Sequence, residues 1–145
     1  MKVGLDIHGT IDKDPEGFIQ YIELCLKWRV SVYIISGPPT SLMIKHLEAL
    51  GKKYKNLLKY CHIISPIDTF HLVSVVEYLR SRDDVEMWQD NRGGWWCDEE
   101  IWWKSKSEIC KELGIDVLID NETRYQDHFK DSDTLFILYG GENEI

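Results

Sequence analysis

The chain has few of the features that would assign it to a specialised class of protein. Its 4 cysteines form no C-x-x-C pair, which argues against a zinc site or a thioredoxin-like redox centre. No apolar run approaches the length needed to cross a membrane, and no secretory signal precedes the first predicted strand. Lys and Arg total 17 against 25 Asp and Glu, and a net charge of −8 gives no electrostatic footprint for nucleic acid. We therefore expect a cytoplasmic, reduced protein with neither a membrane nor a nucleic acid as partner.

Length and composition fit one globular domain that spans residues 1–145. A hydrophobic content of 43% is ordinary for a globular protein, and a chain of this size buries a core without disulfides or metals. Cys25 and Cys110 fall on the apolar faces of predicted helices, so we expect both to be buried.

Short apolar runs alternate with helical patterns along the chain. This alternation predicts an α/β fold, a Rossmann-like three-layer sandwich around a central parallel sheet with right-handed crossovers. The expected strands cover residues 2–6, 31–35, 61–65, 117–119 and 134–138. The expected helices cover residues 15–29, 38–51, 69–80 and 106–113.

Residues 85–103 interrupt the alternation and carry five of the six tryptophans. Two short apolar stretches flank the turn-rich residues 90–94, which predicts a small Trp-rich β-hairpin insertion. Exposure of so much aromatic surface without a purpose would be costly. Two interpretations follow: the hairpin packs on the sheet edge as added core, or it forms a small cap over a site.

Three predicted strands end in polar residues that could meet at one edge of the sheet. The run Val3-Gly4-Leu5 ends at Asp6 and turns through His8-Gly9-Thr10, the second strand leads into Ser36-Gly37, and the fourth ends at Asp120. Ligands of open α/β sheets bind outside the carboxyl ends of the strands. Lys106 begins the helical pattern before the fourth strand and could bring a positive charge to this edge. Lys104, two residues earlier, is an alternative candidate for this lysine.

The ordered set Asp6, Ser36, Lys106 and Asp120 resembles the haloacid dehalogenase superfamily, in its capless or small-cap form. The resemblance covers most of the chain, least clearly residues 66–103. It implies Mg²⁺-dependent hydrolysis of a phosphorylated small molecule, a nucleotide or another phosphomonoester, through an aspartyl-phosphate on Asp6. It further implies that Asp6, the backbone carbonyl of His8 and Asp120 bind the metal.

The remaining roles follow from the chemistry of phosphoryl transfer, which needs positioned donors and charge neutralisation. Ser36 and Gly37 would bind the phosphate, assisted by N–H groups at the start of the next helix, and Lys106 would offset its charge. His8 stands where most phosphatases of the superfamily carry a catalytic acid, and an imidazole can donate a proton to a leaving oxygen. Asn121 replaces an acid that many members carry, which removes one negative charge from the metal site. Asp12 is expected to be a turn residue.

Three functional interpretations compete. The first is a Mg²⁺-dependent phosphatase. The second is a binding module on the same scaffold, with turnover lost through His8 and Asn121 and the tryptophans used as a partner surface. The third is a receiver domain of the response-regulator type, which also gathers acids, a hydroxyl and a lysine at strand ends; it is disfavoured because the third predicted strand ends at Ser65-Pro66 without an acid.

Overall fold

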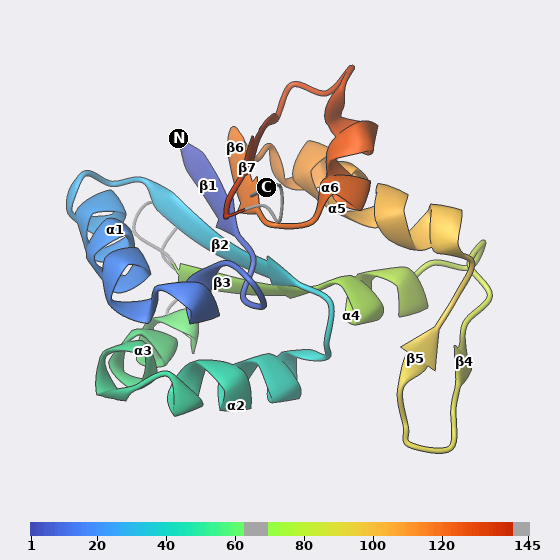
Figure 1. The fold of residues 1–145 in the computed structure, drawn as a ribbon, viewed down its shortest axis with the longest axis horizontal. Coiled ribbons are helices and arrows are strands. Elements are labelled where there is room, and N and C mark those ends of the chain that lie inside the picture. The colour runs from blue at the N-terminus through green and yellow to red at the C-terminus, as the bar shows by residue number, and fades with distance from the viewer. Residues whose placement is uncertain (63–69, 141–145) are drawn as a thin grey trace.

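The computed structural model describes residues 1–62 and 70–140, and a five-stranded parallel sheet forms its centre (Figure 1). The strand order is β3-β2-β1-β6-β7, and every neighbouring pair is parallel. The strands are β1 (Lys2–Leu5), β2 (Ser31–Ser36), β3 (Phe70–Ser74), β6 (Val117–Asp120) and β7 (Leu135–Leu138). A separate antiparallel hairpin pairs β4 (Trp88–Gln89) with β5 (Trp95–Trp96). The predicted fold class, a parallel sheet with a Trp-rich hairpin, is confirmed.

Helices cover both faces of the sheet and enclose two apolar clusters. One cluster joins the sheet to α1, α2 and α3, with Ile19, Leu47 and Leu57 as helix contributions. The other joins it to α4, α5 and α6 and contains Cys110. The helices are α1 (Pro15–Lys27), α2 (Thr40–Ala49), α3 (Lys52–Leu58), α4 (Val75–Arg80), α5 (Glu99–Leu113) and α6 (Thr123–Gln126), with 3₁₀ turns η1 (Ile11–Lys13), η2 (Lys59–His62) and η3 (Asp127–Phe129). Cys25 and Cys110 are both buried, as expected.

The strand order places a switch point between β1 and β6. Counted along the chain, the five strands of the sheet lie in the order 3-2-1-4-5, which is the Rossmann-type arrangement, whereas receiver domains have 2-1-3-4-5. The receiver interpretation is therefore wrong. The crevice where ligands bind in such sheets lies at the carboxyl ends of β1 and β6.

The third strand is not where the sequence pattern placed it. Residues 69–80 were expected to form one helix, but residues Phe70–Ser74 form β3 and only Val75–Arg80 are helical. The Ser74 hydroxyl accepts a hydrogen bond from the Glu77 N–H and so caps the helix in the middle of the expected segment. Of the strand expected at 61–65, Cys61 lies in η2, and the remainder falls at or beyond the limit of the described residues.

Helix α5 is longer than the sequence predicts, and the hairpin is correspondingly shorter. Asp98 caps the helix by accepting hydrogen bonds from the N–H groups of Glu100 and Ile101, so α5 begins at Glu99 instead of residue 106. Trp102 and Trp103 are therefore helical residues and not part of the hairpin.

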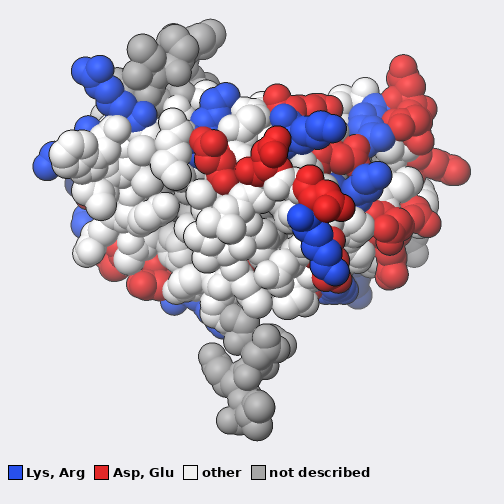
Figure 2. All heavy atoms as spheres, turned by 90° about the horizontal axis from the view of Figure 1, so that it is seen from above, with Lys and Arg blue, Asp and Glu red and all other residues white. Residues whose placement is uncertain are grey.

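The hairpin stands beyond α4 at the right of Figure 1, away from the sheet. Trp88 and Trp96 face each other across it and are 53% and 54% exposed, so the interpretation of these two residues as added core is wrong. The face seen in Figure 2 mixes basic and acidic side chains, and the acidic ones gather at the right-hand end. Within the described residues, no helix combines the length and apolar character required to cross a bilayer.

Candidate functional site

A buried cluster of three charged side chains lies at the carboxyl edge of the sheet. The Lys106 Nζ atom is 3.1 Å from Asp6 Oδ1 and 2.5 Å from Asp120 Oδ2. The three side chains are 2%, 9% and 0% exposed for Lys106, Asp6 and Asp120. Asp6 follows β1 and Asp120 ends β6, so the two carboxylates occupy the switch point that the strand order defines.

The chain reaches this arrangement because β1 is buried in the sheet and the residues after it turn sharply at Gly9. The Asp6 N–H donates to the Ile119 carbonyl at 3.1 Å, which keeps Asp6 in line with β6. Gly9 has φ +82°, and a Cβ atom there would lie 2.2 Å from an Asn121 amide atom. A glycine is required on both counts, since the backbone is left-handed and Asn121 fills the space.

Two carboxylates share one ammonium in this cluster. Burial alone would lower the pKa of Lys106, but the charges of Asp6 and Asp120 outweigh it and raise the pKa, so the side chain stays cationic. Burial raises the pKa of Asp120, and the nearby charge of Asp6 adds to this while Lys106 opposes it. The backbone N–H of Glu122 also donates to Asp120 Oδ1 at 3.0 Å. The cluster therefore favours an added cation or proton.

Tyr125 closes the cluster from the side of α6. The Lys106 Nζ atom lies 4.3 Å from the centre of its ring, a cation–π contact. Burial raises the pKa of Tyr125 to about 12, against the opposing effect of the Lys106 charge. The hydroxyl thus stays protonated, and its ring shields Lys106 from water.

Asn121 bridges two of the predicted metal ligands. Its amide nitrogen faces Asp6 Oδ2 at 3.2 Å and the His8 carbonyl oxygen at 2.8 Å, because both neighbours accept hydrogen bonds. Its N–H group occupies the point on which Asp6 and the His8 carbonyl converge. These two oxygens thus already share a single hydrogen-bond donor.

The His8 side chain points toward solvent at the same edge. It is 52% exposed, and its Nδ1 atom lies 3.5 Å from Asp12 Oδ2. The other Asp12 oxygen accepts a hydrogen bond from the Gly9 N–H at 2.7 Å, which confirms Asp12 as a turn residue and fixes its carboxylate. The His46 ring of α2 packs edge-on against His8, with centroids 4.6 Å apart. With Nδ1 directed at Asp12, the Nε2 atom of His8 is left for a ligand.

Ser36 ends β2 with a buried hydroxyl that has no hydrogen-bond partner among the described residues. The residue is 1% exposed, and an unpaired buried hydroxyl is uncommon because it carries a desolvation cost. The N–H groups at the start of α2 were expected to assist it. One of these groups already has a partner, since the Thr40 N–H donates to Glu77 Oε1 at 3.0 Å and the Thr40 hydroxyl donates to Oε2.

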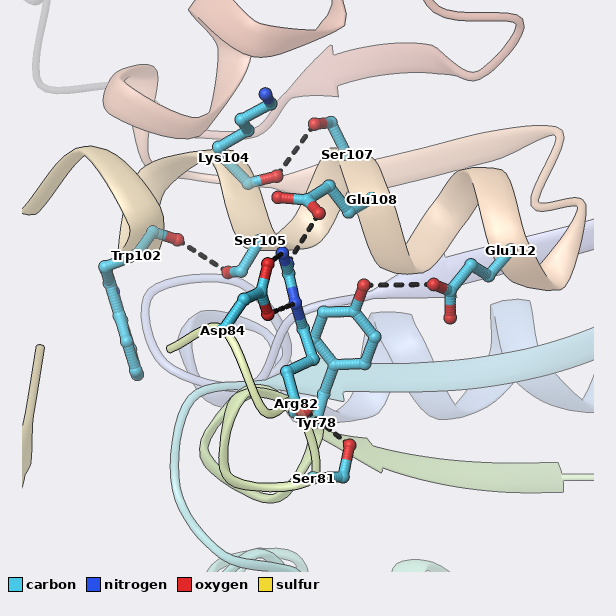
Figure 3. Close-up of polar contacts among 10 residues, drawn as sticks. All are labelled: Tyr78, Ser81, Arg82, Asp84, Trp102, Lys104, Ser105, Ser107, Glu108 and Glu112. Carbon is cyan, nitrogen blue, oxygen red and sulfur yellow. Dashed lines mark hydrogen bonds and ion pairs between the residues drawn. The ribbon is translucent and has the colours of Figure 1, made fainter. Parts of the chain in front are cut away.

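Of the two candidate lysines, only Lys106 reaches the carboxylates. Lys104 is exposed, although both lie in α5. A polar network joins α4 and the segment that follows it to α5, the helix that carries Lys106 (Figure 3). Arg82 pairs with Asp84 and with Glu108 of α5 at 2.7 and 2.6 Å, and Tyr78 donates to Glu112 of α5 at 3.2 Å.

Sequence reasoning did not select Tyr125, Glu77 or His46, and it assigned Trp102 to a hairpin that could cap a site, not to the helix that carries Lys106. None of the four lies in a recognisable motif. Trp102 could have been found once α5 was known to begin at Glu99, because it then precedes Lys106 by four residues, about one helical turn.

Comparisons with known proteins found no relative of this chain. No family model matches the chain, and neither the curated proteins nor the solved structures contain a significant match.

Proposed function

We propose that the protein is a Mg²⁺-dependent phosphatase that hydrolyses small phosphomonoesters through an aspartyl-phosphate on Asp6. The observation that carries the proposal is the buried Asp6–Lys106–Asp120 cluster at the switch point of the sheet. Buried charges are costly, and a cluster with more carboxylates than cations at a ligand-binding edge is typical of a functional site.

The proposed reaction has two balanced halves. An Asp6 carboxylate oxygen attacks phosphorus, the bond from phosphorus to the ester oxygen breaks, and that oxygen takes a proton from His8. Water then attacks the aspartyl-phosphate, gives a proton to His8 and releases inorganic phosphate with the Asp6 carboxylate restored. Lys106 holds Asp6 Oδ1 throughout and orients the carboxylate.

The oxygen atoms at the site fit Mg²⁺. The metal prefers oxygen ligands and uses one or two carboxylates with waters. Asp6, the His8 carbonyl and Asp120 would hold it, although within residues 1–62 and 70–140 no three His, Cys, Asp or Glu side chains form a ready metal site. The Asn121 nitrogen would have to turn away from Asp6 and His8. When bound, the ion would neutralise charge on the phosphoryl oxygens.

Ser36 and His8 supply the remaining proposed contacts. A phosphate oxygen would accept the hydrogen bond that the Ser36 hydroxyl lacks, next to the backbone at Gly37. Asp12 orients His8 through Nδ1, so that Nε2 exchanges the proton with the ester oxygen.

The test is phosphate release from an aryl phosphate, with Mg²⁺ and with a chelator. Turnover should require Mg²⁺ and be lost in Asp6→Asn, while Asp131→Asn, an exposed acid, serves as the matched control and retains it. Equal turnover in Asp6→Asn would refute the mechanism.

A second candidate function is a phosphate- or metal-binding module without turnover. The Asn121 nitrogen supports it, because this group already satisfies Asp6 and the His8 carbonyl as a cation would. The double variant His8→Asp with Asn121→Asp separates the two candidates. A gain of phosphatase activity from an inert parent would favour the binding module, and a loss of existing activity would favour the enzyme.

A further inference from the structure

We infer that Trp102 is a specificity-determining residue, and that the site prefers phosphate esters whose organic group is a flat aromatic ring. The inference rests on the proposed phosphate position beside Ser36 and Gly37. It adds the class of group that the phosphate carries.

The first observation is the contact between Trp102 and Gly37. A Cβ atom on Gly37 would lie 3.1 Å from Cζ2 and 3.4 Å from Cη2 of the Trp102 ring. The indole edge therefore rests against the backbone that follows Ser36. A group attached to a phosphate at Ser36 would therefore lie close to this ring.

The second observation is that the ring is held in place and only partly buried. Trp102 lies one helical turn before Lys106 in α5, and its partly buried side chain packs against the apolar cluster that joins the sheet to α4, α5 and α6. In Figure 3 the ring extends away from the axis of α5. A rigid aromatic side chain with accessible surface loses little conformational freedom when a ligand packs on it.

The third observation is that the turn after β2 is fixed against the ring. The Val76 N–H donates to the Gly37 carbonyl at 3.1 Å, and Glu77 binds Thr40 at the start of α2. The turn is thus tied to α4 on both sides of its two prolines. The distance from Trp102 to the phosphate position is consequently set by the fold.

A pair of non-hydrolysable ligands tests the inference. Benzylphosphonate and cyclohexylmethylphosphonate match in charge and size and differ in whether the ring is flat. Their affinities are measured by calorimetry with Mg²⁺, for the wild type and for Trp102→Phe, Trp102→Leu and Trp96→Leu. Trp96 is the control because it is an exposed tryptophan of the hairpin.

We expect the wild type and Trp96→Leu to bind the benzyl compound about threefold to tenfold more tightly, the range typical of aromatic pairs. Trp102→Phe should keep a preference, and Trp102→Leu should bind both compounds equally. Equal binding in the wild type, or a preference that survives in Trp102→Leu, overturns the inference and leaves the phosphatase proposal standing. If neither phosphonate binds and no phosphate is released in the turnover assay, both proposals fail.

Discussion

Replacement of Lys106 by Met tests the energetics of the charged cluster most severely. The variant keeps the volume of the side chain but leaves Asp6 and Asp120, 9% and 0% exposed, without the ammonium that both contact. Removal of one partner from a buried ion pair costs about 3–5 kcal/mol, because the remaining charge stays desolvated. That is a large part of the roughly 5–15 kcal/mol by which a domain of this size is stable.

The loss of stability in Lys106→Met should be measurable by both chemical and thermal unfolding. At about 2–4 °C per kcal/mol for a domain of 150 residues, the melting temperature should fall by about 6–20 °C. Lys104→Met is the matched control, since Lys104 lies in the same helix and is exposed. Its free energy of unfolding should change by less than about 0.5 kcal/mol.

The pH dependence of the same variant has a definite sign. Burial already raises the pKa of Asp120, and loss of Lys106 removes an opposing effect, so the folded protein holds a proton more readily than the unfolded chain. The free energy of unfolding of Lys106→Met should therefore rise as the pH is lowered from 7 toward about 5. The difference between its free energy of unfolding and that of the wild type should become smaller. If Lys106→Met loses less than about 1 kcal/mol of its free energy of unfolding at pH 7, measured by urea unfolding, the reasoning is refuted.

Three further predictions concern single contacts. Ser36→Ala should not lower the free energy of unfolding, because the hydroxyl has no partner among the described residues, yet it should raise the KM for a phosphate ester; an unchanged KM would contradict the proposed role. Tyr54→Phe should cost about 1 kcal/mol in urea unfolding through loss of the hydrogen bond to the Pro15 carbonyl, and a neutral result would contradict this. Burial, with the charge of Lys2, lowers the pKa of His71, so the unfolded chain binds more protons than the folded one. The free energy of unfolding should therefore fall as the pH drops below about 6.5. His71→Gln should flatten that pH dependence, and a profile identical to that of the wild type would argue against this explanation.

The sequence located the candidate site because its residues follow buried strands. Runs of apolar residues ending in Asp6, Ser36 and Asp120 indicate three adjacent strands, and the parallel sheet then brings their ends together. The selection of Lys106 required only the prediction of a helix before the strand that ends at Asp120. These features are local in sequence, so pattern reasoning could reach them.

The third strand could not be read from the same patterns. Leu72, Val75, Val76 and Leu79 have helical spacing, but Leu72 belongs to β3 and the other three to α4. The boundary depends on pairing of β3 with β2 and on the Ser74 cap, and tertiary pairing overrides spacing in short segments.

The details of the site depend on long-range contacts. The Asn121 amide meets Asp6 and the His8 carbonyl only because β1 and β6 are neighbours. Trp102 reaches Gly37 only because α5 begins at Glu99 and brings this side chain against the residue that follows β2. No spacing within one segment encodes such contacts, which is why Tyr125 and Glu77 were also missed.

The central claim is that Asp6 becomes phosphorylated during turnover. Purified protein should be mixed with an excess of aryl phosphate and Mg²⁺, quenched in acid within the first turnover, and analysed by mass spectrometry with peptide mapping. The account predicts one added phosphoryl group on the peptide that contains Asp6, absent in Asp6→Asn and absent with chelator. Turnover without any phosphorylated protein, or a phosphoryl group on another residue, would contradict it.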